Sequence, residues 1–201
     1  MSEPAVDHRR AMAERNGAAI LDATERLLAA QQPLSMVAVA AEAGVSRPTL
    51  YAHHATLSAV IEAAVCRAID VSVAAVEAAE LDAGPADEAL DRMIAASWGR
   101  LATLDALARV AAEHVPAEHV HRSHAPLMRH VAGLVERGQR EGVFRSDLPV
   151  DWLVRTYFAL VHAADAYARG PLVKRTDALG LLQTSVHALF SAAAAQPRGQ
   201  R

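Results

Sequence analysis

The sequence contains few of the residues and segments that mark several common protein classes. Its 201 residues include one cysteine, Cys66, which excludes an internal disulfide and a cysteine-rich metal site. No run approaches the roughly 18 consecutive apolar residues of a membrane span, and the N-terminus lacks the apolar segment of a signal peptide. We therefore expect a cytoplasmic protein that does not contact the membrane.

Positive charge is also scarce. Lys174 is the only lysine, and the formal net charge is −3. Within the first 60 residues, five arginines stand against six carboxylates, so no overall basic field attracts this segment to nucleic acid. Any contact with DNA must come from local placement of charge and from free backbone amides at helix starts.

The motifs of enzymes are missing as well. The sequence has no glycine-rich phosphate loop and no cysteine nucleophile with a suitable base. It also has no paired carboxylates in a setting that would shift their pKa values. We therefore predict no catalytic activity and no cofactor.

Helical periodicity, in contrast, extends over nearly the whole chain, and no long segment alternates as a strand does. The pattern predicts an all-α fold of about nine helices, with a three-helix head and a larger helical domain. A polar loop is expected at 116–126 between two prolines. The expected helices are about 11–31, 35–43, 46–53, 57–81, 86–101, 104–115, 127–142, 150–169 and 174–194.

The most informative stretch runs from Ser35 to Tyr51. Ser35 and Ser46 are good N-caps for two short helices, and Gly44 between them can adopt the positive φ of a tight reversal. This is the helix-turn-helix plan, in which the second helix reads bases with its N-terminal residues. Three apolar residues are expected to pack between the helices and fix their crossing angle: Ala40, Val45 and Leu50.

The exposed residues of the second helix suit DNA. Arg47 offers a planar donor fork for a guanine edge or a phosphate, and Pro48 is tolerated in a first helical turn. The hydroxyls of Thr49 and Tyr51 can bond phosphate oxygens, which sets register rather than sequence. The alternative is a solvated helix face at a corner between core helices.

Arg9 and Arg10 are expected to precede the first helix, where they could form an arm that reaches the minor groove or the DNA backbone. The candidate DNA-binding residues are therefore Arg9, Arg10, Ser35, Ser46, Arg47, Pro48, Thr49, Tyr51 and His53.

The segments ILDATERLLAA and SMVAVAAEAGVSRPTLYAHH resemble the DNA-binding domain of the TetR family of bacterial regulators, over about residues 15–65. The resemblance implies a homodimer with DNA-binding heads at one end and a larger C-terminal domain that binds a small inducer. It predicts domains at 1–55 and 56–201. The residues that carry it are Gly44, Val45, Ser46, Thr49, Leu50 and Tyr51.

The sequence departs from the family pattern after the second helix. Relatives usually have an aromatic residue, then proline or a small residue, and a lysine at the head of the next helix. Here those positions are His54, Ala55 and Leu57, and Val37 stands where a polar residue is common. We expect fewer charge contacts to DNA than in a typical relative. His53 and His54 could add weak donors below pH about 6.5, although packing is favoured for His54.

The segment EHVPAEHVHRSH (113–124) contains four histidines: His114, His119, His121 and His124. Imidazole and carboxylate groups suit zinc, nickel or copper. The spacing lacks the i, i+4 pair of a strong helical site, however, and the expected loop would leave these side chains on the surface. The favoured interpretation is a surface histidine cluster, and no metal is predicted.

An inducer cavity in this family lies among the C-terminal helices, so some of their large side chains are expected to line it. His162 and Asp165 interrupt the apolar face of the predicted 150–169 helix. Because buried polar groups need partners, their partner is either a ligand or another group of the bundle. The candidate ligand-binding residues are Trp98, Leu101, Met128, Tyr157, Phe158, His162 and Asp165.

The last two helices are more apolar than one small domain needs, which favours pairing with the same helices of a second chain. We therefore predict a homodimeric repressor that binds operator DNA and is released by an unknown small-molecule inducer. The alternative is a helical protein-interaction module without specific DNA binding.

Overall fold

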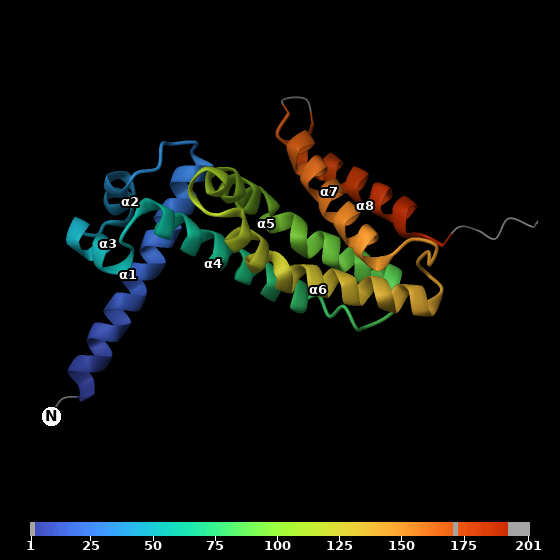
Figure 1. Ribbon diagram of the computed structural model, residues 1–201, viewed down its shortest axis with the longest axis horizontal. Helices are drawn as coiled ribbons and strands as arrows, with labels where there is room; N and C mark the ends of the chain where they lie inside the picture. The colour runs from blue at the N-terminus through green and yellow to red at the C-terminus, as the bar shows by residue number, and fades with distance from the viewer. Residues whose placement is uncertain (1–2, 171–172, 193–201) are drawn as a thin grey trace, which may run out of the picture. The chain divides into compact units, whose positions relative to one another are not determined.

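The computed structural model describes residues 3–170 and 173–192 (Figure 1). The all-α prediction is confirmed, because the described part of the chain contains helices and one isolated bridge, between Phe144 and Ser191. The helices are α1 (Glu3–Ala29), α2 (Met36–Ala43), α3 (Arg47–His53), α4 (Leu57–Glu77), α5 (Ala86–His114), α6 (Ala117–Glu141), α7 (Val150–Ala168) and α8 (Arg175–Phe190).

Four boundaries differ from the sequence prediction, the first being that α1 begins at Glu3 and not near residue 11. The ranges 86–101 and 104–115 form the single helix α5, since no glycine or proline lies between them to end a helix. The polar loop expected at 116–126 is wrong: α6 begins at Ala117 and continues through Pro126. The helix expected over 57–81 ends at Glu77. The last two residues of the range 174–194 lie outside the described part.

The chain divides into two compact units. The first contains residues up to Ile69 together with Thr103–Ser123, and the second contains Asp70–Ala102 together with the chain from His124 onward. Helices α4, α5 and α6 each contribute residues to both units. The division predicted at residues 55 and 56 would instead separate α4 from the head, and it stays a prediction.

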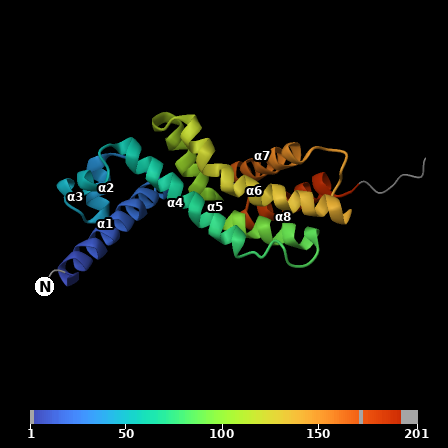
Figure 2. The same ribbon diagram turned by 60° about the horizontal axis from the view of Figure 1, so that its bottom comes forward.

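The first unit is built around a small apolar core. The buried face of α1 packs against α2 and α3, as the two views show (Figures 1 and 2). Ala40 and Leu50 are buried and Val45 is partly buried against them, which confirms the packing expected between α2 and α3. The buried members of this core are Ile20, Leu27, Val39, Ala40, Leu50 and Val60.

Two arginines fasten the helices of this unit together. Arg26 near the end of α1 donates from Nε to Glu42 Oε1 of α2 at 2.6 Å. Arg67 of α4 donates to Asp22 at 2.7 Å and to Glu25 at 2.6 Å, both on α1. Since Arg67 is partly shielded from solvent, we expect this fork to hold α4 against α1 more firmly than a surface ion pair does.

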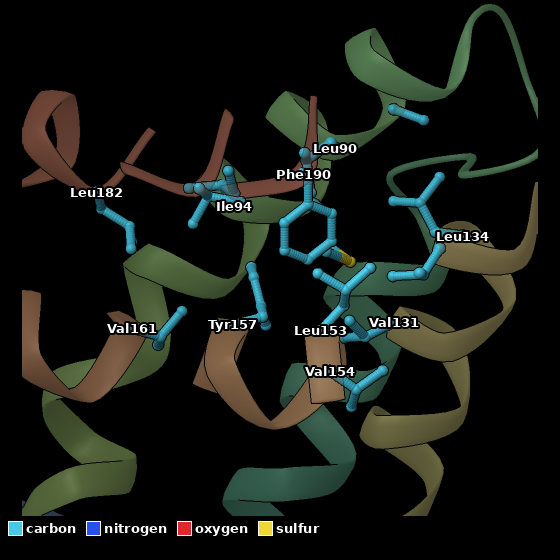
Figure 3. Packing of buried hydrophobic residues seen from close by; sticks show 14 of the residues in the cluster. Leu90, Ile94, Val131, Leu134, Leu153, Val154, Tyr157, Val161, Leu182 and Phe190 are labelled. Carbon is cyan, nitrogen blue, oxygen red and sulfur yellow. The ribbon is translucent and has the colours of Figure 1, made fainter. Parts of the chain in front are cut away.

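The second unit has a larger core formed by α5, α6, α7 and α8 with the end of α4. Figure 3 shows Tyr157 and Leu153 of α7 turned toward Phe190 of α8 and toward Val131 of α6. The Phe190 ring meets the Phe144 ring edge to face, with centroids 5.5 Å apart. Aromatic packing of this kind fixes how the end of α8 lies against the turn after α6.

Candidate nucleic-acid interface and ligand site

Three backbone devices shape the helix-turn-helix. The Ser35 hydroxyl accepts the Ala38 N–H at 3.1 Å and caps α2. Gly44 ends α2 with φ +67°, and its N–H and that of Val45 return to carbonyls of α2. The Ser46 hydroxyl then accepts the Thr49 N–H at 3.2 Å and caps α3. Both caps and the positive-φ glycine were predicted from the sequence, and all three are confirmed.

Some of the predicted DNA-contact residues of α3 are exposed, and others are hydrogen-bonded within the protein. Arg47, Pro48 and Tyr51 are exposed, and the Tyr51 side chain is 53% accessible. The Thr49 hydroxyl lies 2.7 Å from the Ser46 hydroxyl, so these two groups are bonded to each other. Arg47 is the one formal charge among residues 35–52 besides Glu42, which is paired with Arg26.

The two histidines that follow turn partly inward. The His53 ring lies beside α1, and its Nδ1 would stand 3.6 Å from a Cβ at Gly17. His54 ends α3 and is half-buried. Burial lowers the pKa of His54, and the neighbouring His53 lowers it further. His54 is therefore neutral over more of the physiological pH range than a free histidine, which weakens it as a charged donor to phosphate.

The expectation that Arg9 and Arg10 precede the first helix is wrong. Both residues are exposed on α1, which begins at Glu3. Arg10 Nε donates to Glu14 at 3.1 Å, one turn further along. The first turns of α1 extend beyond α2 and α3 (Figures 1 and 2), so these arginines stand on a projecting helix and not on an extended arm.

The predicted ligand residues lie in different surroundings within the second unit. Trp98, Leu101 and Tyr157 are buried in its core, while Met128 and Phe158 are partly buried against it. His162, in contrast, is exposed on α7. The pattern of apolar residues alone did not show on which side of α7 His162 lies.

Asp165 is the buried polar residue that the sequence pointed to, and its partners are now identified. Its carboxylate is fully buried. It accepts from Arg175 at 3.0 Å and from Arg169. Arg175 also donates to the Trp98 carbonyl at 2.8 Å and lies over the Trp98 ring, 4.5 Å from its centroid. The bundle itself therefore satisfies Asp165, and Arg175 joins α5, α7 and α8.

Tyr157 contrasts with Asp165, because its phenol is buried and has no hydrogen bond of normal geometry. Burial raises the pKa of Tyr157 to about 12, although the nearby Ser97 hydroxyl partly opposes this shift. A raised pKa means that burial of the neutral phenol stabilises the fold below pH 10, and that this contribution is lost as pH rises to about 12.

We accordingly expect one of the three tyrosines to ionise only near pH 12 in the folded chain. Tyrosinate absorbance during an alkaline titration measures this step, and Tyr157→Phe should remove it. Ionisation of all three tyrosines together near pH 10 in a chain that circular dichroism reports as folded would contradict the burial.

With the geometry established, comparison with known proteins identifies the family. Residues 20–64 match the family model described as bacterial regulatory proteins, tetR family. This segment is a DNA-binding domain of the TetR-family type. The match runs from the buried half of α1 through the helix-turn-helix to α4, which is the segment whose caps and core are described above. No curated protein sequence matches the chain.

Solved structures of TetR-family regulators share the fold over most of the chain. A regulator from Rhodococcus sp. is 22% identical with a TM-score of 0.75, covering 88% of this chain and 98% of its own. LfrR from Mycobacterium smegmatis, solved with proflavine, is 22% identical with a TM-score of 0.69, covering 88% and 96%. The fatty acid degradation regulator FadR from Bacillus halodurans is 16% identical with a TM-score of 0.73, covering 85% and 93%.

The N-terminal part of the chain thus has the DNA-binding domain of a bacterial regulator, and the whole chain shares its fold with TetR-family transcriptional regulators, which are not enzymes. Within the described parts of the chain, none of the helices is long and apolar enough to span a membrane.

The histidine-rich stretch of this regulator is helical, which corrects the surface loop expected there. His114 Nδ1 lies 3.0 Å from the Val110 carbonyl oxygen, and His119 Nδ1 lies 2.8 Å from Glu62 Oε1 on α4. The side chain of His121 lies outside the described residues. The described side chains contain no group of three or more metal-ligating residues, so His119 is better explained as a contact between α6 and α4.

The second unit has two surface hollows that no sequence pattern indicated. One, of about 540 Å³, lies at the end of α4 and is lined by acidic residues and His130. The other, of about 500 Å³, lies between α6 and α7 and includes Met128, one of the predicted ligand residues. Hollows of this kind depend on how two helices pack, and a periodic pattern in one helix cannot reveal them.

Proposed function

We propose that the chain is a homodimeric repressor that binds a roughly palindromic operator and leaves it when a small molecule occupies the second unit. The observation that carries the proposal is the capped helix-turn-helix with Arg47 and Tyr51 exposed at the start and on the open face of α3. The N-terminal end of such a helix enters the major groove. The proposal also places the protein in the cytoplasm, without catalytic activity.

Arg47 is the residue we assign to base or phosphate recognition. It is the first residue of α3, it is exposed, and no other side chain of the described residues pairs with it. The hydroxyls of Ser46 and Thr49 are hydrogen-bonded to each other. Their main role is therefore to stabilise the start of α3, and contact with phosphate is secondary. Tyr51 offers a free phenol one turn further along.

A gel shift against the promoter next to the protein's own gene tests this function. Arg47→Ala should weaken binding by about 5- to 150-fold, since a bidentate arginine–base pair contributes about 1–3 kcal/mol. Tyr51→Phe removes one hydroxyl and should weaken binding by about 2- to 10-fold. Arg140→Ala, which removes an exposed arginine of α6, serves as the matched control and should change little.

The absence of a specific shift on any nearby intergenic DNA would contradict the repressor function and favour the protein-interaction module. Equal weakening by Arg47→Ala and Arg140→Ala would contradict the assignment of Arg47 while leaving DNA binding itself intact.

The proposed dimer uses the outer faces of α7 and α8. Small side chains dominate these faces, which allows the helices of two chains to approach closely. Large apolar groups flank them, with Leu181 54% exposed on α8 and Tyr167 56% exposed on α7. The small exposed residues include Ala159, Ala163, Ala166, Gly180, Thr184 and Ala188. Pairing of these helices across a two-fold axis makes a four-helix interface.

Release from the operator is proposed as a population shift. An inducer that binds one arrangement of the helices more tightly favours that arrangement, and the spacing of the two heads then no longer fits adjacent major grooves. Helix α4 contributes to both units and is fastened to α1 by Arg67. It is therefore the physical link through which a change in the second unit reaches the head.

A further inference from the structure

The exposed face of α3 is mostly apolar. The exposed residues of this helix are Arg47, Pro48, Tyr51 and Ala52. Pro48, Tyr51 and Ala52 are spaced i, i+3 and i+4, so their side chains are neighbours on one face of the helix. Leu50, on the other side, is buried in the core of the first unit. The exposed face therefore combines a proline ring, a methyl group and a tyrosine ring with a single charge.

The other polar side chains of α3 are hydrogen-bonded within the protein or turned inward. The Thr49 hydroxyl lies 2.7 Å from the Ser46 hydroxyl, which also accepts the Thr49 N–H. His53 lies beside α1, where its Nδ1 would stand 3.6 Å from a Cβ at Gly17. Among the side chains of this helix, the Arg47 guanidinium and the Tyr51 phenol are therefore the hydrogen-bonding groups that remain for base edges.

An apolar side chain in the major groove recognises one base in particular. Guanine, adenine and cytosine present hydrogen-bonding atoms there, whereas thymine also presents its C5 methyl group. An apolar group placed on a guanine oxygen or a cytosine amino group displaces water without replacing its hydrogen bond, which costs free energy. The same group placed on a thymine methyl removes two apolar surfaces from water. The exposed face of α3 is thus suited to thymine and unsuited to G·C pairs.

We propose that the first unit selects its operator by thymine methyl groups, which contact Pro48, Ala52 and the ring of Tyr51. Arg47 then supplies the hydrogen-bonded contact to a guanine edge or a phosphate. The inference rests on the proposed operator binding and adds which bases are read. Each half-site contains A·T pairs whose thymines face α3, and G·C pairs are disfavoured at those positions.

The low charge of the helix-turn-helix supports this assignment. Arg47 and Glu42 are the formal charges of residues 35–52, and Glu42 is paired with Arg26. The start of α2 is apolar as well, with Val37 51% exposed. Phosphate contacts add affinity without selecting a sequence, and this segment has few groups that make them. Discrimination between the operator and other DNA therefore depends on base edges, where the apolar side chains outnumber the polar ones.

Replacement of thymine by uracil in the operator tests the proposal. Uracil lacks the C5 methyl group and keeps the hydrogen-bonding atoms of thymine. The full chain is titrated in gel shifts with the operator identified as described above, and one thymine at a time is replaced in both half-sites. At the thymines that α3 contacts, binding should weaken by about 15-fold, since each of the two lost methyl contacts contributes about 4-fold. A C·G pair at such a position should bind more weakly still, and 5-methylcytosine should recover part of that loss.

Ala52→Ser distinguishes a methyl contact from damage to the helix. The added hydroxyl disfavours contact with a methyl group, so the ratio of the affinities for thymine and uracil operators should fall close to unity at the thymine that Ala52 contacts. Damage to α3 would instead weaken binding to both operators equally and leave the ratio unchanged, as we expect for Arg47→Ala. Ala74→Ser, at an exposed position of α4 in the second unit, is the matched control and should change neither affinity.

The outcomes separate this inference from the function on which it rests. Specific binding with equal affinity for thymine and uracil at every position overturns the methyl contacts and leaves the repressor function intact. If uracil weakens binding but neither Ala52→Ser nor Pro48→Ser changes the ratio, the assignment of these contacts to α3 is overturned. If the unaltered chain binds no DNA specifically, the proposed function and this inference both fail.

Discussion

Replacing Gly138 with alanine is expected to lower the free energy of unfolding by about 3 kcal/mol or to prevent stable folding. Gly138 is buried in α6, and a Cβ there would overlap the Phe144 ring, standing 2.6 Å from its Cγ. Phe144 cannot move aside easily, because its N–H donates to the Gly138 carbonyl at 3.0 Å and its ring packs on Phe190. Urea unfolding at one protein concentration measures the loss.

Gly133 provides the matched control, because it lies on the same helix with nothing within 4 Å of a built Cβ. Gly133→Ala should stabilise the chain by about 0.5–1 kcal/mol through helix propensity alone. Phe144→Leu replaces the ring with a smaller side chain. In the double variant with Gly138→Ala it should therefore recover part of the lost free energy of unfolding. A stability for Gly138→Ala equal to that of Gly133→Ala would show that Phe144 does not lie against α6 as described.

The second large effect concerns the buried carboxylate of Asp165. Replacing both Arg169 and Arg175 with methionine should cost about 4 kcal/mol, because it leaves a fully buried charge without a partner. Each single replacement should cost only about 1–2 kcal/mol, since the remaining arginine still neutralises Asp165. Arg175→Met should be the costlier of the two, since it also removes the contacts with the Trp98 carbonyl and ring.

Urea unfolding of the two single variants and the double variant gives the coupling energy directly. Arg140→Met on α6 is the control for loss of an exposed arginine and should lie within about 0.5 kcal/mol of the unaltered chain. Additive losses in the double variant would mean that the two arginines do not share one carboxylate.

The helix-turn-helix could be predicted closely because its signals are local. Ser35, Gly44 and Ser46 act on backbone groups within a few residues of themselves, so their caps and the positive φ follow from the sequence. The apolar spacing of Ala40, Val45 and Leu50 likewise placed them between two short helices. The loop predicted at 116–126 is wrong, because the prolines and polar residues that indicate a loop are accommodated in α6, which continues through Pro126.

The ligand-binding candidates show where sequence reasoning ends. Spacing along α7 placed Asp165 on the buried face, but its partners Arg169 and Arg175 come from the end of α7 and from the next helix, and Trp98 comes from α5. The apolar spacing also predicted His162 as a ligand residue with Asp165, yet the turn of the helix puts His162 on the exposed face. The partners of Asp165 and the exposure of His162 both depend on which helices pack against α7. Residue composition does not determine that packing.

By itself the sequence determined that the chain is helical, where the helix-turn-helix begins and turns, and which family its head belongs to. Caps, turns and a 3.6-residue period are properties of neighbouring residues, and they hold in any tertiary arrangement. Only the tertiary structure decided that Asp165 is neutralised within the bundle, that Gly138 faces Phe144, and that α6 and α7 leave a hollow with a charged rim between them. These features join residues far apart in the chain, so they arise only when the helices pack.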